Sequence, residues 1–159
     1  MKNILFIASE GVPFIKTGGL ADVVGSLPKG IDKEYYDVRV ILPKYNCMQK
    51  DMLHYRDHFY MEFNWKNEYV GILEAEYDGI KYYFIDNEYY FNGFKPYCDN
   101  ALFEIEKFAF FSKAALSILP VIGFRPDLIH CHDWQTGLIP VYLHERFAGG
   151  EFYRGIKTV

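Results

Sequence analysis

Two short apolar runs frame a helical pattern in the first part of the chain. Residues 4–8 and residues 37–43 have the length and continuity expected of strands that are buried on both faces. Between them, apolar residues recur at helical spacing and predict a helix over residues 19–33, although Pro28 disturbs its second half. The pattern therefore predicts a strand, a helix and a second, parallel strand, which together form a βαβ unit.

The middle of the chain has the signals of antiparallel strands. Residues 55–63 alternate and are rich in Tyr and Phe, and residues 68–77 and 80–85 predict two further strands. The Asp-Gly dipeptide between the last two strongly favours a hairpin turn. We therefore expect antiparallel strands, with a β-hairpin, inserted between parallel units over about residues 52 to 86.

The last part of the chain returns to alternating helices and strands. Residues 87–100 predict a loop, and residues 104–119 predict a long helix with an apolar stripe. Residues 127–132 predict a buried strand, residues 133–147 a helix, and residues 156–159 the start of one more strand. Because a natural domain rarely stops on the first residues of a core strand, we expect this chain to be a fragment of a longer protein.

Composition places these elements in one globular domain. The chain has 159 residues, of which 50% are hydrophobic and 24% charged. The expected fold class for residues 1–159 is therefore α/β, a Rossmann-like parallel sheet with helices on both faces and a β-hairpin insertion. The net charge of -4 argues against nucleic-acid binding, which needs a basic face. The N-terminal apolar run is too short for a signal peptide or a membrane span, so we expect a cytoplasmic protein without a membrane partner.

A glycine turn with a lysine beside it joins the first predicted strand to the first predicted helix. Gly18 and Gly19 let the main chain approach a ligand closely, because no Cβ stands in the way. Their N–H groups and the charge of Lys16 favour an anion, typically a phosphate. The spacing matches neither the dinucleotide fingerprint nor the P-loop, so a tight turn with a solvated lysine remains the alternative.

A second polar cluster lies at the end of the strand predicted near the C-terminus, where open α/β sheets bind ligands. His130 and His132 share one face of this strand, but their spacing with Asp133 fits no compact zinc signature. Cys131 points to the opposite face, which argues against a Cys-His nucleophile. The remaining interpretation is structural: Asp133 caps the next helix and Trp134 packs.

Several of these segments occur together in a recognisable order. They are Ser9-Glu10 with Lys16-Thr17-Gly18-Gly19-Leu20-Ala21-Asp22-Val23, the strand at residues 38–45, Tyr97 with Asp99, the segment at residues 107–111, and His130-Cys131-His132-Asp133-Trp134-Gln135-Thr136-Gly137. In this order they resemble the bacterial glycogen synthases and plant starch synthases. The resemblance covers nearly the whole chain. It departs from the family pattern in a short segment before Phe108, where Lys107 stands near a position that is often Arg.

The resemblance implies the N-terminal half of a GT-B glycosyltransferase, whose nucleotide-sugar-binding C-terminal domain is absent from these residues. Such enzymes transfer glucose from ADP-glucose, or sometimes UDP-glucose, to the non-reducing end of an α-1,4-glucan such as glycogen. They retain the anomeric configuration and use no metal or other cofactor. Because a GT-B site is built between two domains, we expect this chain alone to be inactive.

The resemblance also assigns roles to single residues. Donor binding falls to Lys16, Gly18 and Gly19, catalysis to Asp22 and Asp133, and substrate binding to Glu10, Tyr97 and Trp134. Two other functions stay open from the residues themselves. The aromatic content of 19% suits a stand-alone carbohydrate-binding or regulatory domain, and the histidines suit a metal-dependent hydrolase.

Overall fold

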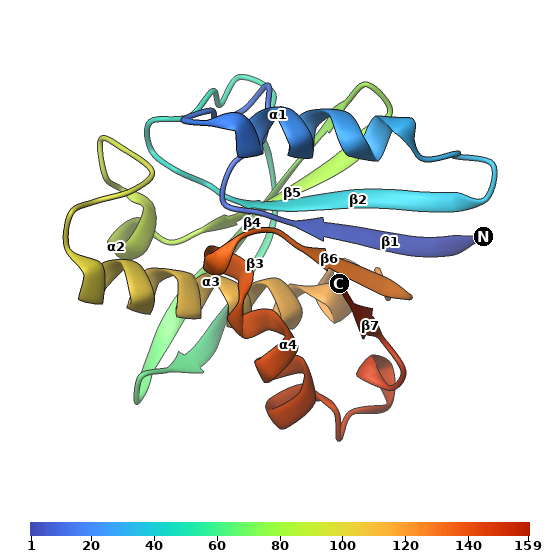
Figure 1. The fold of residues 1–159 in the computed structure, drawn as a ribbon. Helices are drawn as coiled ribbons and strands as arrows, with labels where there is room; N and C mark the ends of the chain where they lie inside the picture. Colours follow the sequence, from blue (N-terminus) through green and yellow to red (C-terminus); the bar gives the residue numbers. More distant parts are fainter.

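The computed structural model describes residues 1–159 and is built on one seven-stranded sheet with the strand order β3-β4-β5-β2-β1-β6-β7 (Figure 1). The strands are β1 (Lys2–Ile7), β2 (Tyr36–Pro43), β3 (His54–Phe63), β4 (Lys66–Tyr77), β5 (Ile80–Asp86), β6 (Leu128–Cys131) and β7 (Lys157–Thr158). From β5 to β7 all neighbouring strands are parallel, whereas β3 and β4 extend one edge in antiparallel pairing.

Helices cover both faces of this sheet. Helix α1 lies on one face, and α3 and α4 lie on the other (Figure 1). The α-helices are α1 (Gly19–Ser26), α2 (Glu88–Phe91), α3 (Ala101–Val121) and α4 (Leu138–Tyr142); shorter turns are η1 (Leu27–Gly30), η2 (Trp134–Thr136), η3 (Leu143–Phe147) and η4 (Glu151–Tyr153). The predicted α/β class, with its parallel sheet and its hairpin, is confirmed. None of these helices is long and apolar enough to cross a membrane.

Two predicted helices are shorter than the pattern indicated. The helix predicted over residues 19–33 leaves α geometry after Ser26 and ends in a 3-10 turn, because Pro28 has no N–H to donate. The segment predicted as one helix over residues 133–147 is divided into a 3-10 turn, a short α-helix and a π-helical turn. The predicted loop at 87–100 contains the short helix α2, whose first turn is capped by the Asn87 side chain.

The predicted insertion is not separate from the parallel sheet. The turn at Asp78 and Gly79 has positive φ at both residues, as in a tight hairpin, and joins β4 to β5. Strand β5 then pairs in parallel with β2, in the register Arg39 with Lys81. Strand β5 is therefore antiparallel to β4, as predicted, and its parallel pairing with β2, which the sequence pattern did not indicate, makes it part of both regions of the sheet.

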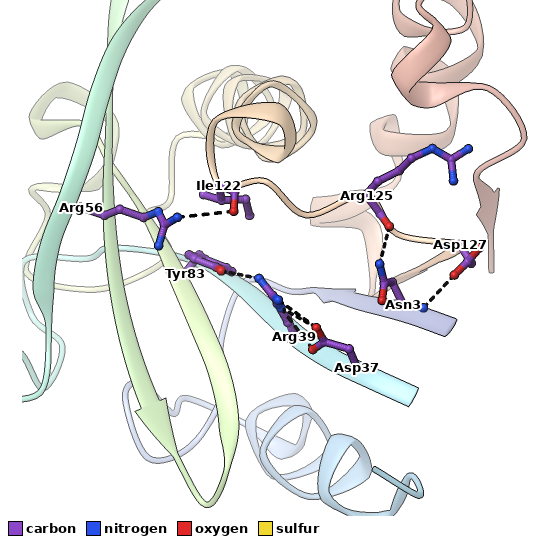
Figure 2. Close-up of polar contacts among 8 residues, drawn as sticks. All are labelled: Asn3, Asp37, Arg39, Arg56, Tyr83, Ile122, Arg125 and Asp127. Carbon is purple, nitrogen blue, oxygen red and sulfur yellow. Dashed lines mark hydrogen bonds and ion pairs between the residues drawn. The ribbon is translucent and has the colours of Figure 1, made fainter. Parts of the chain in front are cut away.

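Polar contacts hold the amino-terminal edge of the sheet, opposite the edge where a ligand would bind (Figure 2). The Asn3 side chain donates to the Arg125 carbonyl over 2.8 Å, and the Asn3 backbone N–H donates to Asp127 Oδ2 over 2.7 Å. Arg39 pairs with Asp37 and donates to the hydroxyl of Tyr83 over 2.7 Å. These bonds join β1 to the segment before β6 and β2 to β5.

Candidate functional site

The predicted site residues gather at the carboxyl ends of β1 and β6. Strand β1 pairs with β2 on one side and with β6 on the other, so the strand order reverses between β1 and β6. Ligands of open α/β sheets bind at such a switch point. Glu10 and the loop at residues 16–19 follow β1, whereas Asp133 and Trp134 follow β6. The fold therefore brings together both polar clusters that the sequence singled out.

Glu10 is a buried carboxylate that organises the glycine loop. It is 4% exposed, and its Oε2 accepts hydrogen bonds from the Thr17 backbone N–H, from Thr17 Oγ1 over 2.9 Å and from the Gly18 N–H over 3.3 Å. Part of the loop's donor capacity is thus already used by Glu10. Helix α1 begins at Gly19 without a side-chain cap, which leaves the first-turn N–H groups to a ligand.

Lys16 and Asp22 form an ion pair beside this loop. The Lys16 Nζ lies 2.7 Å from both carboxylate oxygens of Asp22, and the two side chains are 53% and 55% exposed. Ion pairs at this exposure stabilise a fold weakly, so an anionic ligand can displace the Asp22 carboxylate at small cost. The structure therefore brings together a lysine and an aspartate to which sequence reasoning gave separate roles.

The glycine loop is held close to α1 because Gly25 has no side chain. A Cβ on Gly25 would lie 2.2 Å from Val12 Cγ2 and 2.8 Å from the Val12 carbonyl oxygen. The Val12 N–H also donates to the Ala21 carbonyl over 3.1 Å, which ties the same segment to the helix. The close contact between Val12 and α1 therefore fixes the position of the segment that leads into residues 16–19.

We expect Gly25→Ala to destabilise the protein by about 1 to 3 kcal/mol, because the new methyl group meets the backbone of Val12. Urea denaturation followed by circular dichroism measures this change. Gly30→Ala is the matched control, since nothing lies within 4 Å of a Cβ there. Equal stability of the two variants would contradict the close contact at Gly25.

Tyr97 connects the second cluster to the end of β1. Its hydroxyl lies 2.7 Å from Ser9 Oγ, and burial raises the pKa of the Tyr97 hydroxyl to about 12. The group therefore stays protonated at neutral pH and can donate or accept a hydrogen bond. Tyr97 belongs to the segment between α2 and α3, so three parts of the chain meet here.

A buried ion pair on α3 holds the backbone on both sides of Tyr97. Lys107 and Glu104 are 2% and 6% exposed and contact each other directly. Lys107 Nζ donates to the Pro96 carbonyl over 2.7 Å, and Glu104 Oε1 accepts from the Cys98 N–H over 3.1 Å. We call the Glu104–Lys107 pair with its two backbone hydrogen bonds the Glu104–Lys107 clamp. The sequence analysis missed it, although two opposite charges one turn apart on an apolar helix indicate an ion pair.

A pocket of about 370 Å³ opens between this segment and the turn after β6. Its polar lining includes Asp99, Glu104 and Gln135, and its rings are those of Tyr97 and Trp134. Trp134 is 57% exposed, and its indole packs edge-on against Phe108, with ring centroids 5.4 Å apart. An exposed ring beside carboxylate and amide groups can stack on a sugar and bind its hydroxyls.

Asp133 has a strained backbone and a free side chain. Its φ is 59° and its ψ is -178°, a region that residues with a side chain rarely adopt. Thr136 Oγ1 supports this geometry by donating to the His132 carbonyl over 2.8 Å and to the Asp133 carbonyl over 3.1 Å. The Asp133 side chain makes no capping bond, so the interpretation of this residue as a helix cap was wrong. Such strain is concentrated at functional sites.

The two histidines of β6 pack with an aromatic ring. The rings of His130 and His132 lie 4.3 Å apart, and Phe6 lies against both. Burial lowers the pKa of His130 and lowers that of His132 to about 4, so both rings are neutral at pH 7. No group of three His, Cys, Asp or Glu side chains suited to a metal ion occurs in residues 1–159, which leaves the hydrolase interpretation without a ligand cluster.

Protonation of His132 is expected to destabilise the fold in a defined pH window. In the unfolded chain the imidazole takes up a proton near its ordinary pKa of 6.5, whereas in the folded protein it is protonated only near pH 4. Stability should therefore fall as the pH falls through this window, by about 2 kcal/mol from His132 between pH 7 and pH 5. Urea denaturation at both pH values should show a smaller loss for His132→Phe. An equal loss in the variant would contradict the buried neutral ring.

Comparison with known proteins gives matches over the whole chain. Residues 3–159 match the family model described as the starch synthase catalytic domain. The chain is 64% identical to a glycogen synthase of Lachnospira eligens, over 100% of this chain and 34% of that protein, and 51% identical to one of Desulforamulus reducens, over 99% and 33%. The chain thus spans about one third of the length of these relatives.

A solved structure has the same fold. It is the catalytic domain of starch synthase IV from Arabidopsis thaliana bound to ADP and acarbose. The TM-score is 0.86 and the sequence identity 33%, over 98% of this chain and 32% of that one. The similarity in structure therefore extends over the sheet, the helices and the segments that carry the candidate site.

Proposed function

Because this chain belongs to the starch synthase catalytic domain family, we propose that it is the N-terminal domain of a glycogen synthase of the GT-B type. The longer enzyme transfers glucose from ADP-glucose to the non-reducing end of an α-1,4-glucan and retains the anomeric configuration. One observation carries this proposal: the glycine loop after β1 and a pocket of about 370 Å³ beside Trp134 both lie at the β1–β6 switch point. The starch synthase with a similar fold binds ADP and acarbose, which supports both ligand classes.

The donor diphosphate binds at the loop of residues 16–19. In the transfer, the 4-hydroxyl oxygen of the acceptor forms a bond to the glucosyl C1 while the bond from C1 to the diphosphate breaks. Negative charge grows on the leaving diphosphate, which takes up the proton that the acceptor hydroxyl loses. Lys16 leaves Asp22 to face this charge, and the N–H of Gly19 adds a donor beside the start of α1. The Gly18 N–H adds a second donor when it exchanges its long hydrogen bond to Glu10 for one to the diphosphate. Glu10 supports this arrangement by accepting hydrogen bonds from the loop, and it does not contact the donor.

The glucosyl unit and the acceptor bind on the other side of the switch point. Trp134 supplies a ring for stacking, and the Tyr97 hydroxyl supplies a neutral hydrogen-bonding group. The carboxylate of Asp133 is exposed and unpaired, and Asp22 becomes available when Lys16 turns to the diphosphate. These two carboxylates are the proposed catalytic residues.

Residues outside this chain complete the enzyme. We place most nucleotide-sugar contacts on a C-terminal domain, as expected for a GT-B enzyme, and we place the enzyme in the cytoplasm. A stand-alone carbohydrate-binding or regulatory domain is not favoured, since the relatives that match the whole chain are named glycogen synthases.

The experiment that tests this function measures radiolabelled glucose transferred from ADP-glucose to glycogen. We expect incorporation by the longer enzyme, release of the label by an α-1,4-specific amylase, and no loss of rate with EDTA. Residues 1–159 alone should incorporate nothing. Transfer by residues 1–159 alone would contradict the shared site, and a longer enzyme without transfer activity would contradict the proposed function itself.

A further inference from the structure

Two adjacent residues at the end of β1 hold different parts of the candidate site. Ser9 is fully buried and Glu10 is 4% exposed. Glu10 Oε2 accepts hydrogen bonds from Thr17 and Gly18 in the glycine loop. Ser9 Oγ instead lies 2.7 Å from the hydroxyl oxygen of Tyr97. The donor side of the site is thus tied to Glu10, and the acceptor side is tied to Ser9, a residue to which the proposed function gives no role.

The hydroxyl of Tyr97 is the part of this residue that the backbone contacts leave free. The Glu104–Lys107 clamp fixes the backbone on both sides of Tyr97. The Tyr97 ring is half-buried, and its centroid lies 6.1 Å from that of the Phe108 ring. Neither contact is a hydrogen bond to the hydroxyl at the far end of the ring, so the bond with Ser9 determines where that group lies.

The bond to Ser9 joins a surface segment to the centre of the sheet. It spans 88 residues of sequence, and Ser9 follows β1, which has a parallel neighbour on each side. The residues 92–95 before this segment's anchor are exposed. Glu10 and Thr17 also lie near the Tyr97 hydroxyl, but Ser9 Oγ is its hydrogen-bond partner. The position of the hydroxyl is therefore set by the sheet and not by the exposed segment alone.

The Tyr97 side chain lies beside the ring that would stack on a sugar. Tyr97 and Trp134 line the same pocket of about 370 Å³, and both rings pack against Phe108. A hydrogen-bonding side chain that is already ordered before binding does not lose rotamer freedom when the sugar arrives. Without the bond to Ser9, the ordering of Tyr97 would oppose binding and lower the affinity for the acceptor.

We propose that Ser9 is a positioning residue for the acceptor glucan, because it holds the Tyr97 hydroxyl where a sugar hydroxyl can bond to it. The identity of the ligand rests on the proposed function. Ser9 does not touch the sugar itself, since its side chain is fully buried and acts through Tyr97. The two adjacent residues therefore have different roles: loss of the Ser9 hydroxyl weakens use of the acceptor, and a change at Glu10 weakens use of the donor.

The test measures initial rates of the longer enzyme with maltoheptaose as the acceptor and ADP-glucose as the donor. Ser9→Ala should raise the KM for maltoheptaose about three- to tenfold, the effect of losing one hydrogen bond, and should change the KM for ADP-glucose by less than about twofold. Glu10→Gln should raise mainly the KM for ADP-glucose, since hydrogen bonds from the glycine loop to a neutral amide are weaker than those to a carboxylate. Equal changes of both KM values in Ser9→Ala would indicate a general loss of packing and overturn the positioning role.

A double-mutant cycle with Tyr97→Phe separates positioning from packing. Phenylalanine keeps the ring and removes the hydroxyl that Ser9 holds. In the Tyr97→Phe background, Ser9→Ala should therefore have no further effect on the KM for maltoheptaose. Additive effects of the two substitutions would overturn the inference, because Ser9 would then act independently of Tyr97.

The parent enzyme separates this inference from the proposed function. If the parent transfers no glucose to maltoheptaose, the proposed function and the role of Ser9 are both overturned. If the parent transfers glucose and Ser9→Ala has the same KM for maltoheptaose, only the role of Ser9 is overturned.

Two further variants control for folding. Ser9→Cys fills the space that Ser9→Ala leaves empty but supplies only a weak hydrogen-bonding group, so it should also raise the KM for maltoheptaose. Ser117→Ala removes a half-buried hydroxyl that donates to the Lys113 carbonyl on α3 over 2.9 Å and does not line the pocket, so both KM values should stay at the parent level. A Ser9→Cys variant with the parent KM for maltoheptaose would show that Ser9 only fills space and would overturn the inference.

Discussion

Lys16→Ala in the longer enzyme is expected to lower kcat/KM for ADP-glucose about a hundredfold. Loss of one preorganised group that faces developing charge typically costs on the order of 3 kcal/mol of transition-state stabilisation. The effect should appear mainly in the chemical step, because the ammonium group helps most when the diphosphate has begun to leave. Steady-state kinetics with varied ADP-glucose at saturating glycogen measures it.

The ion pair with Asp22 supplies the control for this prediction. Both side chains are about half exposed, so removal of the Lys16 charge should leave the stability of the fold nearly unchanged. Lys16→Arg should restore little activity, since a planar guanidinium does not replace a compact ammonium. An unchanged kcat/KM in Lys16→Ala would mean that the glycine loop is only a structural turn.

Lys107→Met is expected to destabilise the protein by about 3 to 5 kcal/mol. The substitution removes one partner of a buried ion pair and leaves the Glu104 carboxylate buried without its cation. It also removes the donor to the Pro96 carbonyl, so the segment that carries Tyr97 loses one of its two anchors. Chemical denaturation of residues 1–159 measures the change.

The double variant Lys107→Met with Glu104→Leu distinguishes a buried charge from lost packing. Without either charge, the cost should be much smaller than that of Lys107→Met alone, because the unpaired carboxylate is gone. A double variant that is as unstable as the single one would contradict this explanation. Lys113→Met is the control on the same helix: Lys113 is half-buried and donates to the Glu62 carbonyl but has no ion-pair partner, so its loss should cost less.

Much of the fold was accessible from the apolar pattern alone. The apolar runs that form β1 and β2 are buried on both faces of the sheet. Continuous apolar segments of that length are typical of central strands in a parallel sheet. The hairpin before β5 was predictable because an Asp-Gly turn encodes its own geometry. The parallel pairing of β5 with β2 could not be predicted, since it depends on contacts between residues distant in sequence.

The candidate site was predictable in its position but not in its internal contacts. The carboxyl ends of β1 and β6 follow from strand order, and the residues after them could be read from the sequence. The hydrogen bonds from Glu10 to the glycine loop and the Glu104–Lys107 clamp around Tyr97 depend on where side chains meet in three dimensions. The resemblance assigned substrate binding to Glu10, and that role stays a prediction; the hydrogen bonds of Glu10 to the loop could not be predicted, because the sequence does not show which way its side chain points.

A crystal structure of the longer enzyme with ADP and a malto-oligosaccharide tests the central claim most directly. The account predicts the diphosphate within hydrogen-bonding distance of the Gly18 and Gly19 N–H groups, with Lys16 turned from Asp22 toward it. It also predicts a glucose ring against the Trp134 indole. A diphosphate bound elsewhere, with the Lys16–Asp22 pair intact and the pocket beside Trp134 occupied only by water, would contradict it.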